Sequence, residues 1–411
     1  MTGHAVGTAQ PGAVASRSLR GPLAYAISCF LIWGIAYGLL DVLNKHFQEA
    51  LGVGKAQSTF LQIAYFGAYL TLSIPAGMLL RRAGYKAGIL TGLCLTAFGA
   101  FLFIPSASAA SFPLFVGSMF VLASGLCVLE TSADTYVNVL GDPAGAARRL
   151  NLAQSFNALG VFFGPLIGGS LFFGRKSAAD AEISVQFTYA VIGVAVLLFA
   201  FAIYRARLPE IAEPEHASVG GPETLARRHF ILGVVTQFLY VGAQVGVGAL
   251  FINLAVETWP GMTSRQGAFL LSVGLFGYLV GRFFTTALLA RFSPRRILTI
   301  YGLANTLLCL IVLTGVQKVS TIAAIAIFFF MSAMFATIFS LGVADMGPNT
   351  KRGASLMVMA IGGGVLVPYP MGLLAERFGT PTAFVIPAMC FALVAFYGWK
   401  GAEIHDRAPA K

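Results

Sequence analysis

The sequence predicts an all-α membrane protein of twelve transmembrane helices, arranged as two six-helix halves related by pseudo-two-fold symmetry. Apolar runs long enough to cross a bilayer recur along the whole chain, and the later runs repeat features of the earlier ones. Only 10% of the 411 residues are charged, and 57% are hydrophobic, whereas soluble proteins average about 25% charged residues. Such a chain cannot cover its surface with polar groups, so most of that surface must face lipid.

The basic charge of the chain does not indicate a nucleic-acid-binding protein. The formal net charge is +11, but the lysines and arginines cluster in short loops between apolar runs, which is typical of topology signals. All five cysteines fall inside apolar segments without paired spacing. This pattern predicts neither a disulfide framework nor a metal site.

Crossing the hydrocarbon core takes about 20 apolar residues, and twelve segments of the sequence meet this requirement. We predict spans at 23–45, 57–80, 85–105, 111–138, 150–174, 185–205, 229–254, 266–290, 296–316, 319–344, 353–375 and 381–400. The first run is long for a signal peptide and many others follow it, so we expect it to remain as an uncleaved helix.

The one long interruption, at 206–228, contains three prolines and two adjacent glycines. It divides the chain into five predicted parts: a tail at 1–22, a six-helix bundle at 23–205, a linker at 206–228, a second bundle at 229–400 and a tail at 401–411.

The distribution of lysine and arginine predicts that both termini lie in the cytoplasm. With this orientation, nineteen of the 27 basic residues fall in cytoplasmic segments and seven fall outside, with Arg282 left inside a helix. This bias follows the positive-inside rule. The predicted location is therefore the bacterial inner membrane, crossed many times, with the lipid bilayer as a partner.

The two halves of the sequence also share local features at an offset of about 200 residues. A small residue followed by a basic turn ends both the second span, at 77–86, and the eighth, at 287–296. Gly160 and Pro165 in the fifth span correspond to Gly362 and Pro368 in the eleventh. Duplicated six-helix halves are typical of transporters that work by alternating access.

Three acidic residues lie within predicted spans and are candidates for proton coupling. Asp41 lies in the first span, and Glu130 and Asp134 lie one turn apart in the fourth. An ionisable group at membrane depth costs about 2.5–3.5 kcal/mol on insertion scales, so such groups usually face the bundle interior and have a function. Because Glu130 and Asp134 are so close, we expect the pair to share a proton. The alternatives are solvated or structural carboxylates, above all for Asp134, near the cytoplasmic mouth.

Amide and aromatic side chains in the spans are candidates for binding a polyhydroxyl ligand. Asn151, Gln154 and Asn157 form a stripe in the fifth span, and Gln237, Tyr240 and Gln244 form another in the seventh. Amides both donate and accept hydrogen bonds without charge, and aromatic rings cover the apolar face of a sugar. The predicted substrate-binding set is Gln154, Asn157, Gln244, Tyr240, Phe335, Tyr37 and Gln62. Hydrogen bonding between helices is the alternative role for these amides.

Two further polar residues have structural interpretations. Arg282 in the eighth span is expected to snorkel to the cytoplasmic side or to pair with Asp345. His46 flanks the first span and is expected to be an interfacial histidine.

The chain resembles the fucose–galactose–glucose proton symporters of the major facilitator superfamily, and within them the bacterial L-fucose–proton symporters. The resemblance runs from the first to the tenth span through short strings of residues, which are Asp41-Val-Leu with His46-Phe-Gln48, Ile74-Pro-Ala-Gly77, Gly84-Tyr-Lys-Ala-Gly-Ile89, Leu129-Glu-Thr131, Arg149-Leu-Asn-Leu-Ala-Gln154 with Phe156-Asn157, Tyr240-Val-Gly-Ala-Gln244, Pro260-Gly-Met-Thr263 and Thr337-Ile-Phe-Ser-Leu-Gly342.

This resemblance implies the major facilitator fold and roles for four residues. Asp41 falls on the acid implicated in proton translocation, and Glu130 on the acid that couples protonation to sugar binding. Gln154 and Asn157 fall on residues that line the central cavity.

Three departures from the family pattern leave the identity of the sugar open. Asp134 and Thr135 stand where the family has Asn-Pro, Gly38 to Leu40 stand where it has asparagines, and Phe335 replaces a tyrosine.

The sequence thus predicts a secondary transporter, not an enzyme, that imports a fucose-, glucose- or galactose-type sugar with protons. We expect a monomer without a cofactor. No glycine-rich phosphate loop precedes a Lys-Ser/Thr pair, which argues against an ATP-driven pump. Sodium coupling, import of an amino sugar, and proton-driven export of hydrophobic compounds on the same fold remain alternatives. A membrane sensor is a further alternative, but 206–228 and the C-terminal tail are too short for a signalling domain.

Overall fold

The computed structural model describes residues 20–140, 146–173, 178–209, 227–289, 291–344, 346 and 350–402. Most of each predicted terminal tail and most of the linker predicted at 206–228 lie outside these ranges, as does Asp345. Within the described ranges every regular element is a helix. The helices of the first half are α1 (Arg20–Leu51), α2 (Lys55–Ser58), α3 (Phe60–Ser108), α4 (Phe112–Val139), α5 (Ala146–Phe172) and α6 (Ala178–Arg205).

The second half is more often interrupted, by a proline or by a short irregular turn. Its helices are α7 (Arg228–Thr258), α8 (Ser264–Leu289), α9 (Pro294–Leu313), α10 (Val319–Met331), α11 (Met334–Gly342), α12 (Thr350–Met359), η4 (Ala360–Gly362), α13 (Gly363–Leu366), α14 (Pro368–Phe378), α15 (Thr380–Ala383), α16 (Val385–Phe396) and η5 (Tyr397–Gly401). The prolines Pro294, Pro368 and Pro381 each stand in the first turn of a helix, where a missing N–H group costs nothing.

Twelve helices in the described part of the chain are long and apolar enough to cross a membrane, which confirms the predicted fold class. α3 contains two of these spans, Lys55–Leu80 with α2 and Arg82–Ser108, joined at Gly84. There the backbone has φ 83° and ψ 172°, a conformation open essentially to glycine alone. Large apolar side chains such as Leu198, Phe201 and Phe283 are more than half exposed, as expected for side chains that face lipid.

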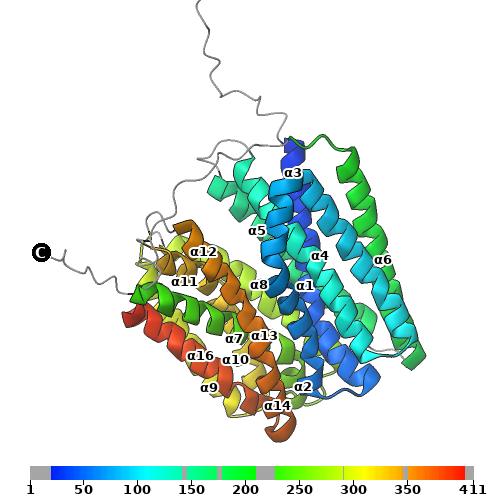
Figure 1. The fold of residues 1–411 in the computed structure, drawn as a ribbon. Helices are drawn as coiled ribbons and strands as arrows, with labels where there is room; N and C mark the ends of the chain where they lie inside the picture. The colour runs from blue at the N-terminus through cyan, green and yellow to red at the C-terminus, as the bar shows by residue number, and fades with distance from the viewer. Residues whose placement is uncertain are drawn as a thin grey trace, which may run out of the picture.

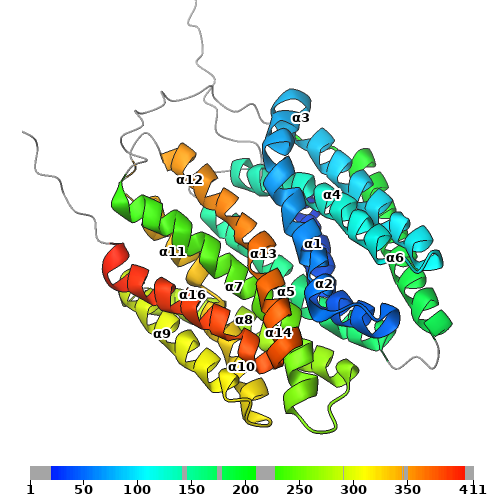
Figure 2. The ribbon, with the colours of Figure 1, turned by 60° about the horizontal axis from the view of Figure 1, so that its bottom comes forward.

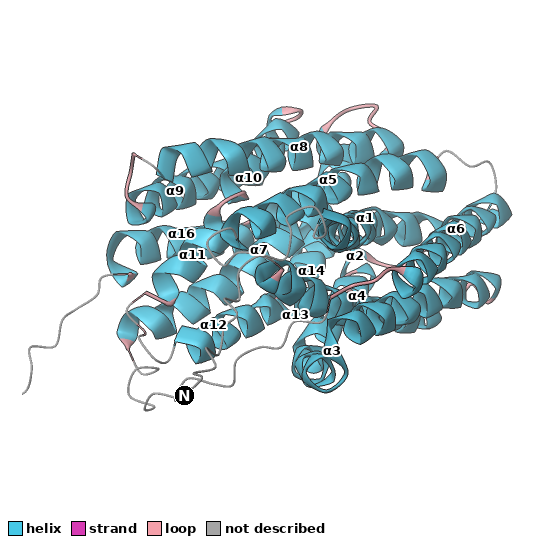
Figure 3. Ribbon diagram, turned by 90° about the horizontal axis from the view of Figure 1, so that it is seen from above, coloured by secondary structure: helices cyan, strands magenta, loops and turns pink. Residues whose placement is uncertain are grey.

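The spans form two groups, which Figure 1 shows side by side, α1 to α6 in blue to green and α7 to α16 in green to red. In the first group α3 packs on α4 and α6, and α1 packs on α5. In the second, α9 packs on α10 and α16, and α7 contacts most of the other helices. Figure 3 shows the same division from above.

The two groups meet closely at one end of the molecule, which we call the closed end. It is the end where α1 stops at Leu51 and α7 stops at Thr258. Here α2 lies against α14, as Figure 2 shows, and α5 lies against α8. The Phe60 and Tyr369 rings stack across the halves at 5.5 Å.

An ion-paired latch joins the two halves at the closed end. The Lys55 Nζ lies 2.5 Å from Glu257 Oε1 and also donates to Thr380 Oγ1 and to the carbonyl of Ala375. Glu257 is held in place by the backbone N–H and hydroxyl of Thr380. Beside it, Glu376 accepts a hydrogen bond from the N–H of Ala56.

Glycines bring α1 and α5 into backbone contact. A Cβ atom at Gly34 would lie 2.1 Å from the Asn157 carbonyl oxygen, and one at Gly164 would lie 2.4 Å from the Gly38 carbonyl carbon. No side chain fits at either position. This close approach is the usual function of small residues between membrane helices.

The first span extends beyond its predicted end. We predicted 23–45, but α1 continues to Leu51, because Lys45 pairs with Glu49 one turn later at 3.5 Å. His46 is consequently buried, only 3% exposed, and its ring lies 5.2 Å from that of Phe172. The expectation of an interfacial His46 was therefore wrong.

Candidate functional site

Asp41 lies inside α1, ten residues before the end of the helix at Leu51. At 1.5 Å per residue this places it about 15 Å from that end. Its side chain is 7% exposed, and its neighbours Leu40 and Val42 are fully buried. No ion pair reaches Asp41 from the residues the structure describes.

Gln62 on α3 lies beside the Asp41 carboxyl group. The Gln62 side chain is fully buried, and the Asp41 carboxyl group is the polar group that its amide interacts with. The structure thus brings two of the predicted site residues together. One turn after Asp41, the Asn44 Nδ2 donates to the Ala249 carbonyl of α7 over 2.7 Å. Asp41 and Gln62 therefore lie next to the contact between the halves.

Aromatic hydroxyl groups extend from Asp41 toward the fourth span. The Tyr37 ring lies one turn before Asp41 and 5.7 Å from the ring of Tyr65 on α3. The Tyr65 hydroxyl accepts a hydrogen bond from Trp33 Nε1 at 3.1 Å and lies 3.5 Å from the Tyr69 hydroxyl. This cluster lies between Asp41 of α1 and Glu130 of α4.

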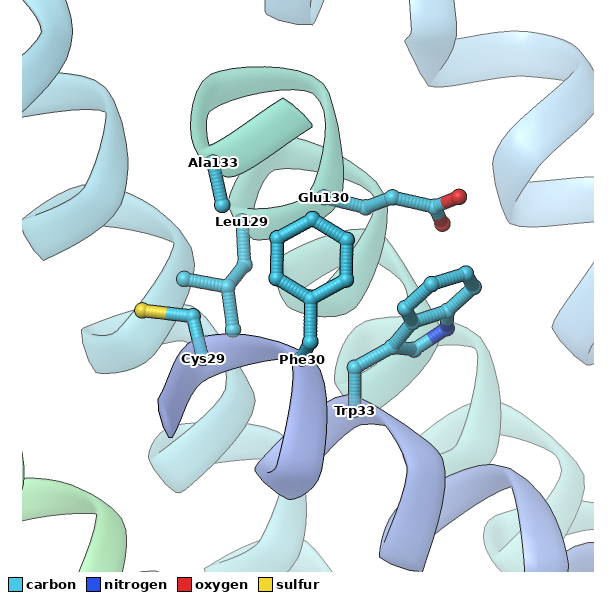
Figure 4. A pocket seen from close by; sticks show the side chains of 6 residues that line it. All are labelled: Cys29, Phe30, Trp33, Leu129, Glu130 and Ala133. Atoms are coloured by element: carbon cyan, nitrogen blue, oxygen red, sulfur yellow. The ribbon is translucent and has the colours of Figure 1, made fainter. Parts of the chain in front are cut away.

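Glu130 on α4 is the second acid of the site, and the Tyr69 hydroxyl interacts with its carboxyl group. Asp134 follows on the same face and interacts with Glu130 electrostatically, as the spacing predicts. Figure 4 shows the Glu130 side chain beside Trp33 in a crevice between α1 and α4. The lining residues are Cys29, Phe30, Trp33, Leu129, Glu130 and Ala133. In this conformation the crevice is too narrow for a sugar.

The second half contributes its own polar cluster next to Tyr37. Tyr240, Tyr278 and Arg282 interact with one another, and Tyr37 interacts with both Tyr240 and Tyr278 across the halves. Arg282 donates to the Tyr278 hydroxyl at 3.2 Å and lies 5.3 Å from its ring centroid. Its predicted partner Asp345 lies outside the described residues. Tyr240 is fully buried and donates to the Met331 carbonyl at 2.8 Å.

The remaining predicted residues do not join this cluster. The Asn157 Nδ2 donates to the Phe30 carbonyl of α1 at 3.4 Å. Gln154, Gln244 and Phe335 are half-buried and make no hydrogen bond or ring contact with other described residues. Their part in binding stays a prediction.

Sequence reasoning missed Tyr65, Tyr69 and Tyr278. The first two lie one turn apart in the second span, on the same face as Gln62, so helical spacing from Gln62 was the signal that could have identified them. Tyr278 precedes Arg282 by one turn. The arginine was the signal there, because a buried cation in a membrane usually has a partner on its own face.

Among the described residues, no three side chains of His, Cys, Asp or Glu lie close enough together to hold a metal ion. The described side chains of the site can form hydrogen bonds through amides and hydroxyl groups, and they can exchange protons at carboxyl groups.

Comparison with known proteins places these residues in a family. The family model of the Major Facilitator Superfamily matches residues 23–365. The L-fucose-proton symporter of Escherichia coli (strain K12) is 37% identical over 408 residues, which is 93% of each chain. The glucose/galactose transporter of Brucella abortus biovar 1 (strain 9-941) is 36% identical over 382 residues, which is 91% of this chain and 92% of the relative.

Solved structures show the same architecture. The E. coli fucose:proton symporter FucP, in the outward conformation, superposes with a TM-score of 0.69 and 36% identity over 94% of this chain and 100% of its own. A bacterial homologue of the human lysosomal transporter Spinster, in an inward-facing conformation, superposes with a TM-score of 0.75 over 94% and 98%. At 14% identity, the second likeness shows the fold alone.

Proposed function

Because the chain belongs to the Major Facilitator Superfamily, in the branch that contains the L-fucose-proton symporter and the glucose/galactose transporter, we propose that it imports a hexose or deoxyhexose together with protons. The chain is a multi-pass protein of the bacterial inner membrane. The relatives favour this proposal over the export of hydrophobic compounds.

The observation that carries the proposal is the pair of acids joined by polar aromatic side chains between the halves. Asp41 and Glu130 both face the interior of the bundle and are linked by the cluster of Tyr37, Tyr65 and Tyr69. Hydroxyl groups and amides match a polyhydroxyl cargo. Carboxyl groups held out of water take up and release protons as their surroundings change. One region of the protein therefore serves both the sugar and the proton.

Asp41 is the proposed proton site. It lies against Gly248 of α7, without a counter-charge among the described residues. An unpaired carboxylate in this contact would be costly, whereas the protonated acid is neutral. Closure after protonation is therefore favoured, and closure without a proton is opposed. This rule would couple proton uptake to transport.

Glu130, with Asp134 beside it, is the proposed link between the proton and the sugar. Its carboxyl group lies in the crevice next to Trp33, and Tyr69 connects it to the other aromatic side chains. A sugar hydroxyl bonded to Glu130 would change the balance between its charged and neutral forms. Asn157 and Gln154 on α5 and Gln244, Tyr240 and Phe335 in the second half complete the proposed binding set.

The molecule is proposed to alternate between states open to each side. The excess of lysine and arginine in one set of loops assigns the closed end to the periplasm. With that orientation the conformation described here faces the cytoplasm, the state from which sugar and proton leave. Opening the closed end would return the site to the periplasm.

Uptake in proteoliposomes tests the proposed function. Purified protein is reconstituted, and labelled L-fucose, D-glucose and D-galactose are supplied outside under an inwardly directed proton gradient. We expect at least one sugar to accumulate, and a protonophore to abolish the accumulation. Matched vesicles without a gradient provide the control for passive exchange. Accumulation that ignores both the gradient and the protonophore, or no uptake of any sugar in the panel, would contradict the proposal.

A further inference from the structure

α1 and α7 cross at equivalent positions of the two halves. Asp41 lies ten residues before the end of α1 at Leu51, and Gly248 lies ten residues before the end of α7 at Thr258. In a molecule built from two repeated halves, such positions face each other across the pseudo-two-fold axis. The hydrogen bond from Asn44 to the Ala249 carbonyl fixes the two helices in this register.

The atoms that most closely limit the space at Gly248 belong to Asp41. A Cβ atom built on Gly248 would lie 2.5 Å from Asp41 Oδ2, 3.1 Å from Cγ and 3.3 Å from Oδ1, and these are its three nearest atoms. Other glycines of α7 differ in this respect, because the atoms nearest to Gly242 and Gly246 belong to Val367 and Met371 of the same half. Position 248 of α7 therefore faces the opposite half, and a side chain there would point at Asp41.

Asp41 has little freedom to move away from an added methyl group. Its side chain is short and 7% exposed, and Leu40, Val42 and Gln62 around it are fully buried. In a closely packed interior, an added atom displaces the groups around it because there is no empty space to accept it. We therefore expect an added methyl group at position 248 to push α7 away from α1.

We propose that Gly248 is a positioning residue of the transport cycle, which lets α7 close over Asp41. Because position 248 has no side chain, the backbone of α7 contacts the Asp41 carboxyl group directly. The closed end forms only when position 248 leaves room for that carboxyl group. The proposal rests on the proposed function in one respect, the identity of Asp41 as the proton site. The steric claim stands independently of the cargo.

Distance measurement between spin labels tests the claim. Labels are placed at Ala109 and Val316, exposed positions at the closed end of each half, with the exposed native Cys94 replaced by serine. In the full-length protein Gly248→Ala is expected to move the label distances to longer values. Uptake is expected to fall by at least about tenfold, since overpacking a tight contact is costly.

Two companion variants separate this effect from simple damage to α7. Gly277→Ala on α8 is the matched control, because nothing lies within 4 Å of its added methyl group, and it should reproduce the parent distances. Asp41→Ala combined with Gly248→Ala removes the carboxyl group from the clash, so the short distances should return although proton-driven uptake stays lost.

The outcomes divide cleanly. Parent-like distances in Gly248→Ala would overturn the proposal, as would long distances that persist in the double variant. If the Gly248→Ala protein is recovered from the membrane in low yield, a normal yield of the double variant would still support the clash, and a low yield of both variants would overturn it. The distances do not depend on any sugar. Failure of the uptake assay with the expected distance pattern would refute the proposed cargo and leave the role of Gly248 intact.

Discussion

At the scale of single residues, the proposed coupling depends on two acids and on the side chains packed around them. Asp41 and Glu130 are conspicuous because charge is rare in apolar spans. The partners of these acids could not be predicted with the same certainty. Tyr65 and Tyr69 are common membrane-helix residues, and only the packing of α3 on α4 brings Tyr69 to Glu130. Gly248 gives no signal at all in the sequence, because its importance depends on a contact with the other half.

Replacing Asp41 by asparagine should separate exchange from accumulation. Asparagine keeps the shape of the side chain and cannot release a proton, so the closed end still forms. We expect accumulation driven by a proton gradient to fall to the background of empty vesicles, while exchange of labelled for unlabelled sugar across the membrane is retained.

Glu130→Gln is the informative comparison for Asp41→Asn. It removes the acid that lies in the Trp33 crevice, so we expect it to weaken sugar binding as well as accumulation. If Asp41→Asn still accumulates sugar against its gradient, Asp41 is not the proton site.

At the scale of helices, periodicity and length predicted the spans well, and errors arose where charges pair locally. The span predicted at 23–45 ends at Lys45, whereas α1 continues to Leu51 and contains the Lys45–Glu49 pair. The interruptions of the second half, such as the break between α10 and α11, were not predicted, because an unbroken apolar run gives no sign of a local turn.

The latch between α2 and the second half should contribute modestly to closure. Lys55 and Glu257 are 23% and 33% exposed, and a partly exposed pair is worth about 0.2–1 kcal/mol. Lys55→Ala should therefore lower the ratio of closed to open molecules by up to about fivefold. The spin-label distances described above would measure the change.

A double-mutant cycle provides the control for this prediction. Each single variant also loses hydrogen bonds of its own, from Lys55 to Ala375 and Thr380 and from Thr380 to Glu257. The double variant should therefore change the ratio by less than the two single effects combined, because the ion pair is lost in both. Strictly additive effects would show that the two side chains act independently.

At the scale of the whole molecule, the duplicated pattern predicted the architecture, and the conformational state could not be predicted. Glycines and prolines at matching positions of the fifth and eleventh spans indicated two halves. In the proposed cycle the same sequence adopts both a closed and an open arrangement of those halves, so no pattern of residues selects one. Contacts such as that of Asn44 with Ala249 depend on the arrangement of the halves and could not be predicted from the sequence.

Reporter fusions should establish the orientation of the molecule. With both termini in the cytoplasm, green fluorescent protein fused after Lys411 should fluoresce, and alkaline phosphatase at that site should be inactive. Alkaline phosphatase inserted between Ser108 and Phe112, in a turn at the closed end, should be active. The opposite pattern of activities would invert the assignment of the closed end to the periplasm.

The glycine contact between α1 and α5 has a mechanical consequence. At Gly34 and Gly164 the two backbones touch. No side chain there can change its rotamer to absorb a displacement, so the two helices move as one rigid unit. Asp41 lies on one of these helices and Asn157 on the other. In the proposed cycle, a shift of α1 on protonation of Asp41 would therefore move α5 and Asn157 directly, without intermediate side chains to relay it.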